Sequence, residues 1–273
     1  MADSLSVNVE SIANLELRAK QPLRTTHEAE HSGTESLISS IQKAMAELFG
    51  TYILIFAGCG AALVKESLPL TIIGIATVSG LALTVATYSF GHISGGHFNP
   101  AVTIALAASR KFQLKLVPTY VLCQLMGAIL ATVTLKVLYH DKVDIGVTVT
   151  QYLSSTSDLE ALVWEFIITS ILMFTICGAA TDHRGSKDLT GVAIGIAVMI
   201  SAIIAGPITG ASMNPARSLA PAIVSGDYKN IWVYIVGPTL GAVCASVLYT
   251  FLRVAKPVKP EPFHMCSHNP LTL

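Results

Sequence analysis

The stretch Gly91-His-Ile-Ser-Gly-Gly-His-Phe-Asn-Pro-Ala-Val-Thr103 returns later in the chain, in altered form, as Gly206-Pro-Ile-Thr-Gly-Ala-Ser-Met-Asn-Pro-Ala-Arg-Ser218. The two copies align without a gap. Six positions are identical, and two more exchange Ser and Thr. Self-similarity of this kind indicates that the chain is built from two related halves.

Each copy contains an Asn-Pro-Ala triplet that is expected to start a helix. Asn is a preferred N-cap residue, and Pro suits the first helical position because its missing N–H needs no partner there. The apolar segments around the triplets, 98–109 and 213–224, are too short to cross a bilayer and too apolar for ordinary loops. We therefore predict two re-entrant half-helices that enter the membrane without crossing it.

The rest of the chain has the composition of a membrane protein. Of its 273 residues, 52% are hydrophobic and only 12% are charged, and the formal net charge is zero, which disfavours a nucleic-acid binder. Runs without Asp, Glu, Lys or Arg, such as 67–109, meet or exceed the roughly 20 residues that a helix needs to cross a bilayer. We predict an all-α membrane protein with six transmembrane helices, near 41–64, 69–91, 116–139, 159–181, 189–206 and 231–253.

Each half then contains three spans and one half-helix. Because three is odd, the second half crosses the membrane upside down relative to the first, and such inverted repeats place their site at the midplane, where broken helices converge. We place the transmembrane domain at 41–254, with repeats at about 41–139 and 159–254. It lies between a polar N-terminal tail (1–40), expected to be disordered or loosely ordered, and a C-terminal tail (255–273).

The distribution of Lys and Arg predicts the orientation. With both ends placed inside, the inner face collects twelve of these residues and the outer face only four, as the positive-inside rule requires. The N-terminal tail contains no apolar stretch typical of a signal peptide. We expect a multi-pass protein of the plasma membrane with both termini in the cytoplasm.

The two half-helices are expected to meet tip to tip and to form a path for a small polar solute. There the side-chain amides of Asn99 and Asn214 can donate hydrogen bonds, and the positive ends of both helix dipoles repel cations. Non-helical backbone at this depth is tolerated only where it lines a wet cavity. The stretches before the tips should therefore expose a ladder of carbonyl groups, from Gly95, Gly96, Gly210 and Ser212.

Arg217 is the only basic residue in an apolar half-helix, directly after the second triplet. A guanidinium in an apolar segment is expensive and normally faces a water-filled cavity. We expect it to donate to a solute and to oppose the passage of protons and cations.

Glu47 and Glu165 occupy matching places in the first span of each half. Viewed alone they suggest a proton relay. We favour a support role, in which each carboxylate accepts hydrogen bonds from backbone N–H groups of a half-loop, the non-helical stretch that precedes a half-helix. His97 is expected to anchor its own half-loop by hydrogen bonds, because its spacing from His92 does not suit a metal site.

No other chemistry stands out in the sequence. The five cysteines show no pairing or metal-ligand spacing, and no nucleophile lies near a base, so we expect no metal, no cofactor and no enzyme activity. Two transport mechanisms remain. A passive channel needs only the tips and the path between them. A coupled secondary transporter of a small neutral solute also uses inverted repeats, but needs a titratable group in the membrane that changes partner.

These features resemble the major intrinsic protein family, the aquaporins and glycerol channels, over essentially the whole membrane region. Residues 206–218 and Thr181-Asp-His-Arg184 are most similar to the nodulin-26-like proteins of plants. The resemblance implies a channel for water and small uncharged solutes that excludes protons and ions. It also implies a homotetramer with one pore in each subunit, in the lipid bilayer and without nucleic acid.

In this family, four residues form the selectivity filter, the narrowest part of the pore. The resemblance places these four positions at Ser79, Ala202, Ala211 and Arg217 in this chain. Water-selective members usually carry an aromatic residue and His at the first two positions, and the nodulin-26-like proteins most often carry Trp and Val there. Three small side chains opposite one Arg imply a wide, polar filter. We therefore expect passage of glycerol, urea, and boric, silicic or arsenous acid.

Overall fold

The computed structural model describes residues 26–65, 70–140 and 142–253, with side chains from residue 38 onward except at 65. All regular structure in these ranges is helical. Among the described residues, six helices are long and apolar enough to cross a membrane, over Ile38–Val64, Ile72–Ser94, Leu114–Tyr139, Asp158–Thr181, Thr190–Thr209 and Ile231–Leu252. The predicted all-α fold with six spans is confirmed, and each end lies within a few residues of its expected place.

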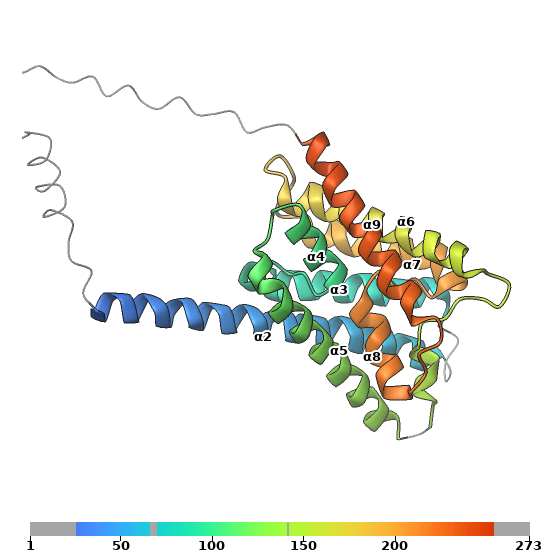
Figure 1. Ribbon diagram of the computed structural model, residues 1–273. Helices are drawn as coiled ribbons and strands as arrows, with labels where there is room; N and C mark the ends of the chain where they lie inside the picture. The colour runs from blue at the N-terminus through green and yellow to red at the C-terminus, as the bar shows by residue number, and fades with distance from the viewer. Residues whose placement is uncertain (1–25, 66–69, 141, 254–273) are drawn as a thin grey trace, which may run out of the picture.

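Figure 1 shows how these helices form a bundle around two shorter ones. The long helices are α2 (Thr26–Lys65), α3 (Ile72–Ser94), α5 (Val117–Tyr139), α6 (Asp158–Ile176), α7 (Thr190–Thr209) and α9 (Ile231–Leu252). The two short helices are α4 (Pro100–Ala108) and α8 (Pro215–Ser225). Three single turns complete the described chain, η1 (Leu114–Leu116), η2 (Ile145–Thr148) and the π-helical η3 (Cys177–Thr181).

The first helix differs from the expected disordered tail. Helix α2 begins at Thr26, so residues 26–40 are helical and extend α2 away from the bundle (Figure 1). Hydropathy marks only membrane spans and does not see a polar helix. The segment is polar and includes Glu28, Glu30 and Glu35. Residues 1–25 of the expected tail, and the C-terminal tail from 254, lie outside the described residues.

The two repeats pack in the same way and exchange their half-helices. Helix α2 packs on α3 and α5, and its counterpart α6 packs on α7 and α9, while α3 and α7 cross between the halves. Each half-helix also lies on the last long helix of the other repeat, α4 on α9 and α8 on α5. This exchange brings the starts of α4 and α8 together in the middle of the bundle.

Glycines let the helices approach closely at these crossings. A Cβ atom on Gly80 would lie 2.5 Å from the carbonyl oxygen of Gly195, and one on Gly195 would lie 2.6 Å from that of Gly80. Gly127 and Gly241 meet the backbone of α2 and α6 in the same manner. No larger residue fits without moving a backbone, so these glycines set the distance between the helices.

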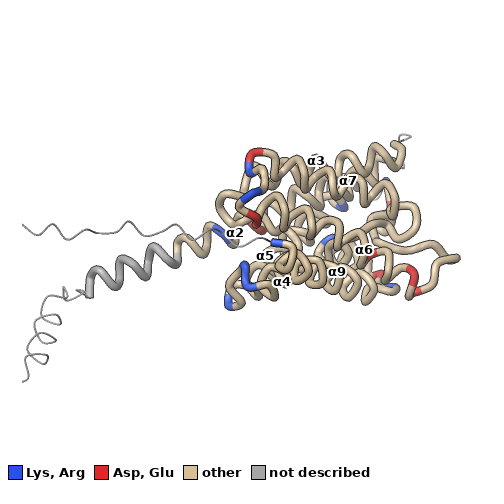
Figure 2. Tube along the Cα trace, turned by 90° about the horizontal axis from the view of Figure 1, so that it is seen from above, with Lys and Arg blue, Asp and Glu red and all other residues tan. Residues whose placement is uncertain are grey.

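Charged side chains lie mostly outside the apolar middle of the bundle. Figure 2 shows Lys and Arg gathered mainly at the end from which α2 emerges, around the link between α4 and α5. Glu47, Glu165 and Arg217 lie within the helices of the bundle instead. Both glutamates are fully buried, which requires that hydrogen bonds satisfy their carboxylates.

Candidate functional site: the pore between the half-helices

Asn99 and Asn214 cap the two half-helices and join them. The side-chain oxygen of Asn99 accepts from the N–H of Ala101 at 2.9 Å, and that of Asn214 accepts from the N–H of Ala216 at 2.9 Å. The amide nitrogen of Asn99 donates to the Met213 carbonyl at 2.8 Å, and that of Asn214 donates to the Phe98 carbonyl at 2.9 Å. Each amide nitrogen carries two hydrogens, so one N–H of each remains for a solute.

Glu47 and Glu165 each hold the half-loop of their own repeat. Glu47 accepts from the N–H groups of His97 (3.0 Å) and Phe98 (2.7 Å). Glu165 accepts from the N–H groups of Ser212 and Met213, both at 2.9 Å. A carboxylate accepts at both oxygens, so one side chain satisfies two adjacent N–H groups. These N–H groups belong to non-helical backbone and have no carbonyl partner within a helix.

Four more residues complete this arrangement, in two equivalent pairs that sequence reasoning did not single out. The hydroxyl groups of Ser94 and Thr209, which close α3 and α7, donate to Glu47 at 2.6 Å and to Glu165 at 2.8 Å. Two buried tyrosines then donate to the carbonyls of these same residues, both at 2.8 Å: Tyr120 to Ser94 and Tyr234 to Thr209. Ser94 and Thr209 align in the sequence repeat, which was the available signal.

The two half-loops differ in what fills the space behind them. In the first, His97 Nδ1 lies 3.1 Å from Thr103 Oγ1, and Gln124 donates to both Thr103 and Glu47. In the second, Ser212 and Ser218 replace His97 and Thr103, and their hydroxyl oxygens lie 2.6 Å apart. Thr150, from the loop before α6, donates to Ser218 at 2.6 Å and closes that network.

Both half-loops use left-handed backbone just before the capping Asn. Phe98 and Met213 have φ values of 47° and 54°, a conformation that costs a non-glycine residue about 1 kcal/mol or more. The Glu47 and Glu165 carboxylates bond the N–H groups of these two residues and offset the strain. The Phe98 ring also fills the space beside Gly50, where a Cβ atom would collide with it.

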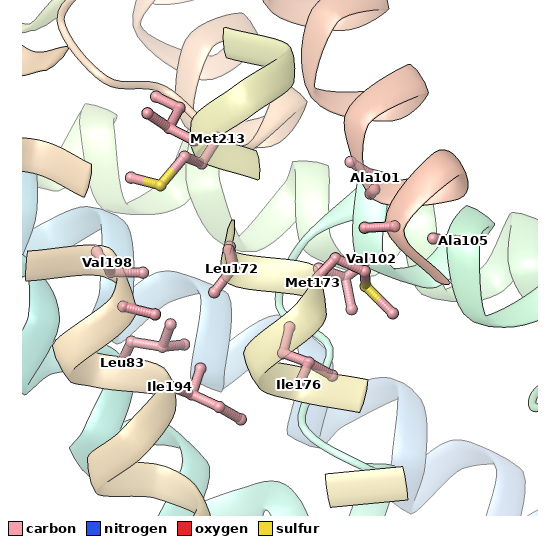
Figure 3. Close-up of a cluster of buried hydrophobic side chains, with 14 of the residues drawn as sticks. Leu83, Ala101, Val102, Ala105, Leu172, Met173, Ile176, Ile194, Val198 and Met213 are labelled. Atoms are coloured by element: carbon pink, nitrogen blue, oxygen red, sulfur yellow. The ribbon is translucent and has the colours of Figure 1, made fainter. Parts of the chain in front are cut away.

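A cavity of about 280 Å³ runs along this junction. Polar groups enter it from the half-loops and their caps, and apolar side chains of α3, α6 and α7 form much of the opposite wall. Leu83, Ile194 and Val198 lie together on that wall, with Leu172 and Ile176 beside them (Figure 3). A polar edge and an apolar wall suit a small solute that moves along the path without strong binding.

The cavity brings together most of the residues that the sequence singled out. Its walls include all four expected filter positions, both capping asparagines, and the half-loop residues Gly96, His97, Gly210 and Ser212. Gly95 is not among the residues that line it. Glu47 and Glu165 also lie outside the lining and support it from behind.

Arg217 lines the cavity from the first turn of α8. Its Nη1 donates to the carbonyl oxygen of Thr148 at 2.7 Å, in the turn η2 that links the two repeats. This bond fixes one edge of the guanidinium and leaves its other N–H groups to the cavity. The role of η2 was not evident from the sequence, because a backbone carbonyl leaves no residue-type signal.

A second polar cluster lies where α6 ends, in the Thr181-Asp-His-Arg184 segment. Asp182 is buried and accepts from the Arg184 side chain at 2.8 and 3.2 Å and from the Tyr249 hydroxyl at 3.2 Å. These bonds, those from Arg184 first, hold the pKa of Asp182 well below its usual range. Lys187 donates to three carbonyl oxygens, of Ala179, Ala180 and Asp182, and so ties the loop to the end of η3.

The cysteines of the described chain are free thiols, and Cys59 lines the cavity. Cys266 lies outside the described residues. Within the part of the chain that the structure describes, His, Cys, Asp and Glu form no group of three that could hold a metal ion.

Six spans in an inverted repeat, with two capped half-helices joined at the middle of a continuous cavity, define a membrane channel of the aquaporin architecture. Comparison with known proteins agrees. Residues 35–249 match the family described as Major intrinsic protein, and the chain belongs to this family.

Individual relatives extend this assignment. The chain is 50% identical to Nodulin-26 of Glycine max over 227 residues, which cover 81% of this chain and 82% of that protein. It is also 50% identical to Aquaporin NIP1-1 of Oryza sativa subsp. japonica over 222 residues, 80% of this chain and 77% of that one. Among solved structures, the aquaglyceroporin from Plasmodium falciparum is similar, with a TM-score of 0.72, 28% identity, and coverage of 77% and 95%. The chain is therefore a passive membrane channel for water and small solutes, of the nodulin-26-like group.

Proposed function

We propose that this channel conducts small uncharged polyhydroxylated or amide solutes as well as water, namely glycerol, urea, and boric, silicic or arsenous acid. The observation that carries the proposal is the composition of the filter. Ser79, Ala202, Ala211 and Arg217 all line one cavity, and three of these four side chains are small. A narrow filter excludes solutes larger than water by size, and this one lacks the side chains that would do so.

Its polar groups suit neutral solutes. The free N–H groups of Asn99, Asn214 and Arg217 can donate to hydroxyl or carbonyl oxygens of a solute. The half-loop carbonyls of Gly96, Gly210 and Ser212 can accept from it, whereas Gly95 lies outside the cavity lining. The guanidinium and the positive ends of α4 and α8 oppose the entry of protons and cations.

The contacts of Glu47 and Glu165 favour a passive channel over a coupled transporter. Each carboxylate binds two backbone N–H groups and a hydroxyl, and Glu47 also binds Gln124. These donors belong to the half-loops and to the helices that support them, whereas a coupled transporter needs a titratable group that changes partner. We assign both glutamates, with His97, to support of the half-loops, and we propose no enzyme activity and no cofactor.

We further propose the placement of the chain in the cell. The channel domain covers 41–254, forms a homotetramer in the plasma membrane, and has both termini in the cytoplasm. The gathering of Lys and Arg at the end of the bundle from which α2 emerges supports this orientation (Figure 2).

The test is stopped-flow permeability of proteoliposomes that contain the purified full-length chain, with water, urea, glycerol and boric acid. The wild type should pass all four. Ser79→Phe and Ala202→His, alone and together, should reduce flux of the three solutes and keep water flux, because they refill the filter with bulky side chains. Wild-type permeation by water alone would overturn the proposal.

A further inference from the structure

The link between the first half-helix and the next span, residues 109–116, concentrates positive charge. It contains three basic residues and no acidic one. The inverted repeat offers a comparison at the opposite end of the bundle, where residues 226–230 join α8 to α9 and carry one acidic and one basic residue. The charge of the α4–α5 link therefore belongs to the end of the bundle from which α2 emerges (Figure 2), and does not follow from the repeat.

Contacts with the bundle divide these basic residues into two kinds. The Nζ of Lys111 donates to Cys177 Sγ at 3.4 Å and lies 5.6 Å from the centre of the Tyr249 ring. Arg110 and Lys115 are exposed instead, and neither side chain has a hydrogen-bond or ion-pair partner within the part of the chain that the structure describes. Two cations thus remain for an anion from outside the protein.

The link that carries these two cations is anchored to the bundle. The Phe112 ring lies 4.7 Å from the His97 ring and 4.7 Å from the Tyr120 ring, measured between ring centres. Binding costs less free energy when the backbone that presents the binding groups is already fixed. The packing of Phe112 therefore prepares Arg110 and Lys115 to bind a partner.

An exposed apolar stripe begins beside the cations and shows how deep the link lies in the membrane. The apolar span that contains α5 begins at Leu114, which is 74% exposed. Leu122, Met126 and Leu130 follow at intervals of four residues along α5 and are also exposed, so they lie on one face of the helix. A pair of cations at the edge of an apolar face matches a phospholipid, whose acyl chains lie directly below its phosphate.

We propose that Arg110 and Lys115 bind the phosphate of an anionic phospholipid, with Leu114 and the exposed stripe of α5 against its acyl chains. A guanidinium suits a phosphate because it can donate two parallel hydrogen bonds, and Lys115 adds a second positive charge. A zwitterionic headgroup carries a positive charge that these cations repel, so the site prefers lipids of net negative charge. The inference goes beyond the proposed function and holds whichever small solutes the channel conducts.

The experiment is native mass spectrometry of the purified full-length chain in detergent, titrated with phosphatidylglycerol or with phosphatidylcholine of the same acyl chains. The wild type should bind phosphatidylglycerol more tightly. The double variant Arg110→Gln/Lys115→Gln should lose this preference by roughly tenfold or more, because each cation near the membrane surface attracts an anionic lipid. Arg110→Lys/Lys115→Arg keeps both charges and should retain the preference.

The matched control is Lys142→Gln/Lys229→Gln, which removes two exposed cations at the opposite end of the bundle and should leave the preference unchanged. A loss as large as that of Arg110→Gln/Lys115→Gln would overturn the inference, since any exposed cation would then suffice. Equal affinity of the wild type for the two lipids would overturn it as well, and so would a preference that survives in Arg110→Gln/Lys115→Gln.

Two measurements on the wild type complete the test. Glycerol 3-phosphate carries the phosphate without acyl chains and should not displace phosphatidylglycerol, whereas displacement would assign the site to a soluble phosphate and overturn the lipid. Added salt should weaken the binding of phosphatidylglycerol and leave that of phosphatidylcholine unchanged. Phosphatidylglycerol binding that ignores salt would contradict the role of the two cations, even if the double variant did not fold.

Discussion

Asn99 and Asn214 bind each other's half-loop: the amide of each donates to the carbonyl of the residue that precedes the other, at 2.8 and 2.9 Å. The same side chains cap α4 and α8 through their oxygens. One residue type thus ends the extended segment, starts the helix and joins the two repeats. The pore centre is built from two copies of this unit.

Because Asn99 both caps α4 and binds the other half-loop, two substitutions at this position should have different effects. Asn99→Ser keeps a hydroxyl that can cap α4 but is too short to reach Met213, whereas Asn99→Ala loses both functions. We expect the apparent free energy of unfolding to fall by about 1 kcal/mol for Ser and by about 2 kcal/mol or more for Ala. Unfolding by a denaturing detergent, followed by circular dichroism, measures both. Equal losses for the two variants would contradict the bond between the half-loops.

The buried carboxylates give a second prediction. Glu47→Gln replaces one acceptor oxygen by an NH₂ group, which would face either the donors of Ser94 and His97 or those of Phe98 and Gln124. We expect a loss of about 1–3 kcal/mol in the free energy of unfolding, since buried donors remain without acceptors. In the wild type, where both glutamates only support the half-loops, solute flux should not respond to a pH gradient. A flux that follows such a gradient would favour a coupled transporter.

The charge of Arg217 gives a third prediction. Arg217→Val removes the guanidinium from the filter and its bond to the Thr148 carbonyl. We expect water flux to persist and proton leakage to rise, because only the positive ends of α4 and α8 then oppose cations. A pH-sensitive dye enclosed in proteoliposomes measures the leakage. Arg217→Lys keeps the charge and is the control. Leakage no greater than that of the wild type in Arg217→Val would mean that the half-helices suffice.

A fourth prediction concerns pH and the loop after α6. The pKa of Asp182 is lowered in the folded protein, so its ion pair with Arg184 stabilises the fold above the ordinary carboxyl pKa, near pH 4, and this contribution is lost as the pH falls below it. Asp182→Asn should therefore be less stable than wild type at pH 7, and the gap should narrow toward pH 3. Thermal unfolding in detergent at several pH values measures the gap. A constant difference would contradict the assignment.

The sequence predicted the fold and the centre of the pore because both rest on local signals. Charge-free runs mark the spans, and Asn-Pro-Ala marks a capped helix wherever it occurs. Pairs such as Tyr120 with Ser94 were not predictable in this way, since a buried tyrosine in an apolar span is an ordinary core residue until its partner is known. The Thr148 carbonyl on Arg217 leaves no trace in the sequence at all. The helical start at Thr26 was missed because hydropathy detects spans and ignores polar helices.

The contact between Gly80 and Gly195 has a consequence for how solute preference can change. Since the two backbones touch there, the frame of the bundle is held independently of the adjacent side chain at Ser79. Single substitutions at Ser79 can therefore change the width of the filter while the packing of α3 against α7 stays the same. A channel of this architecture can thus come to conduct a different solute without any change of fold.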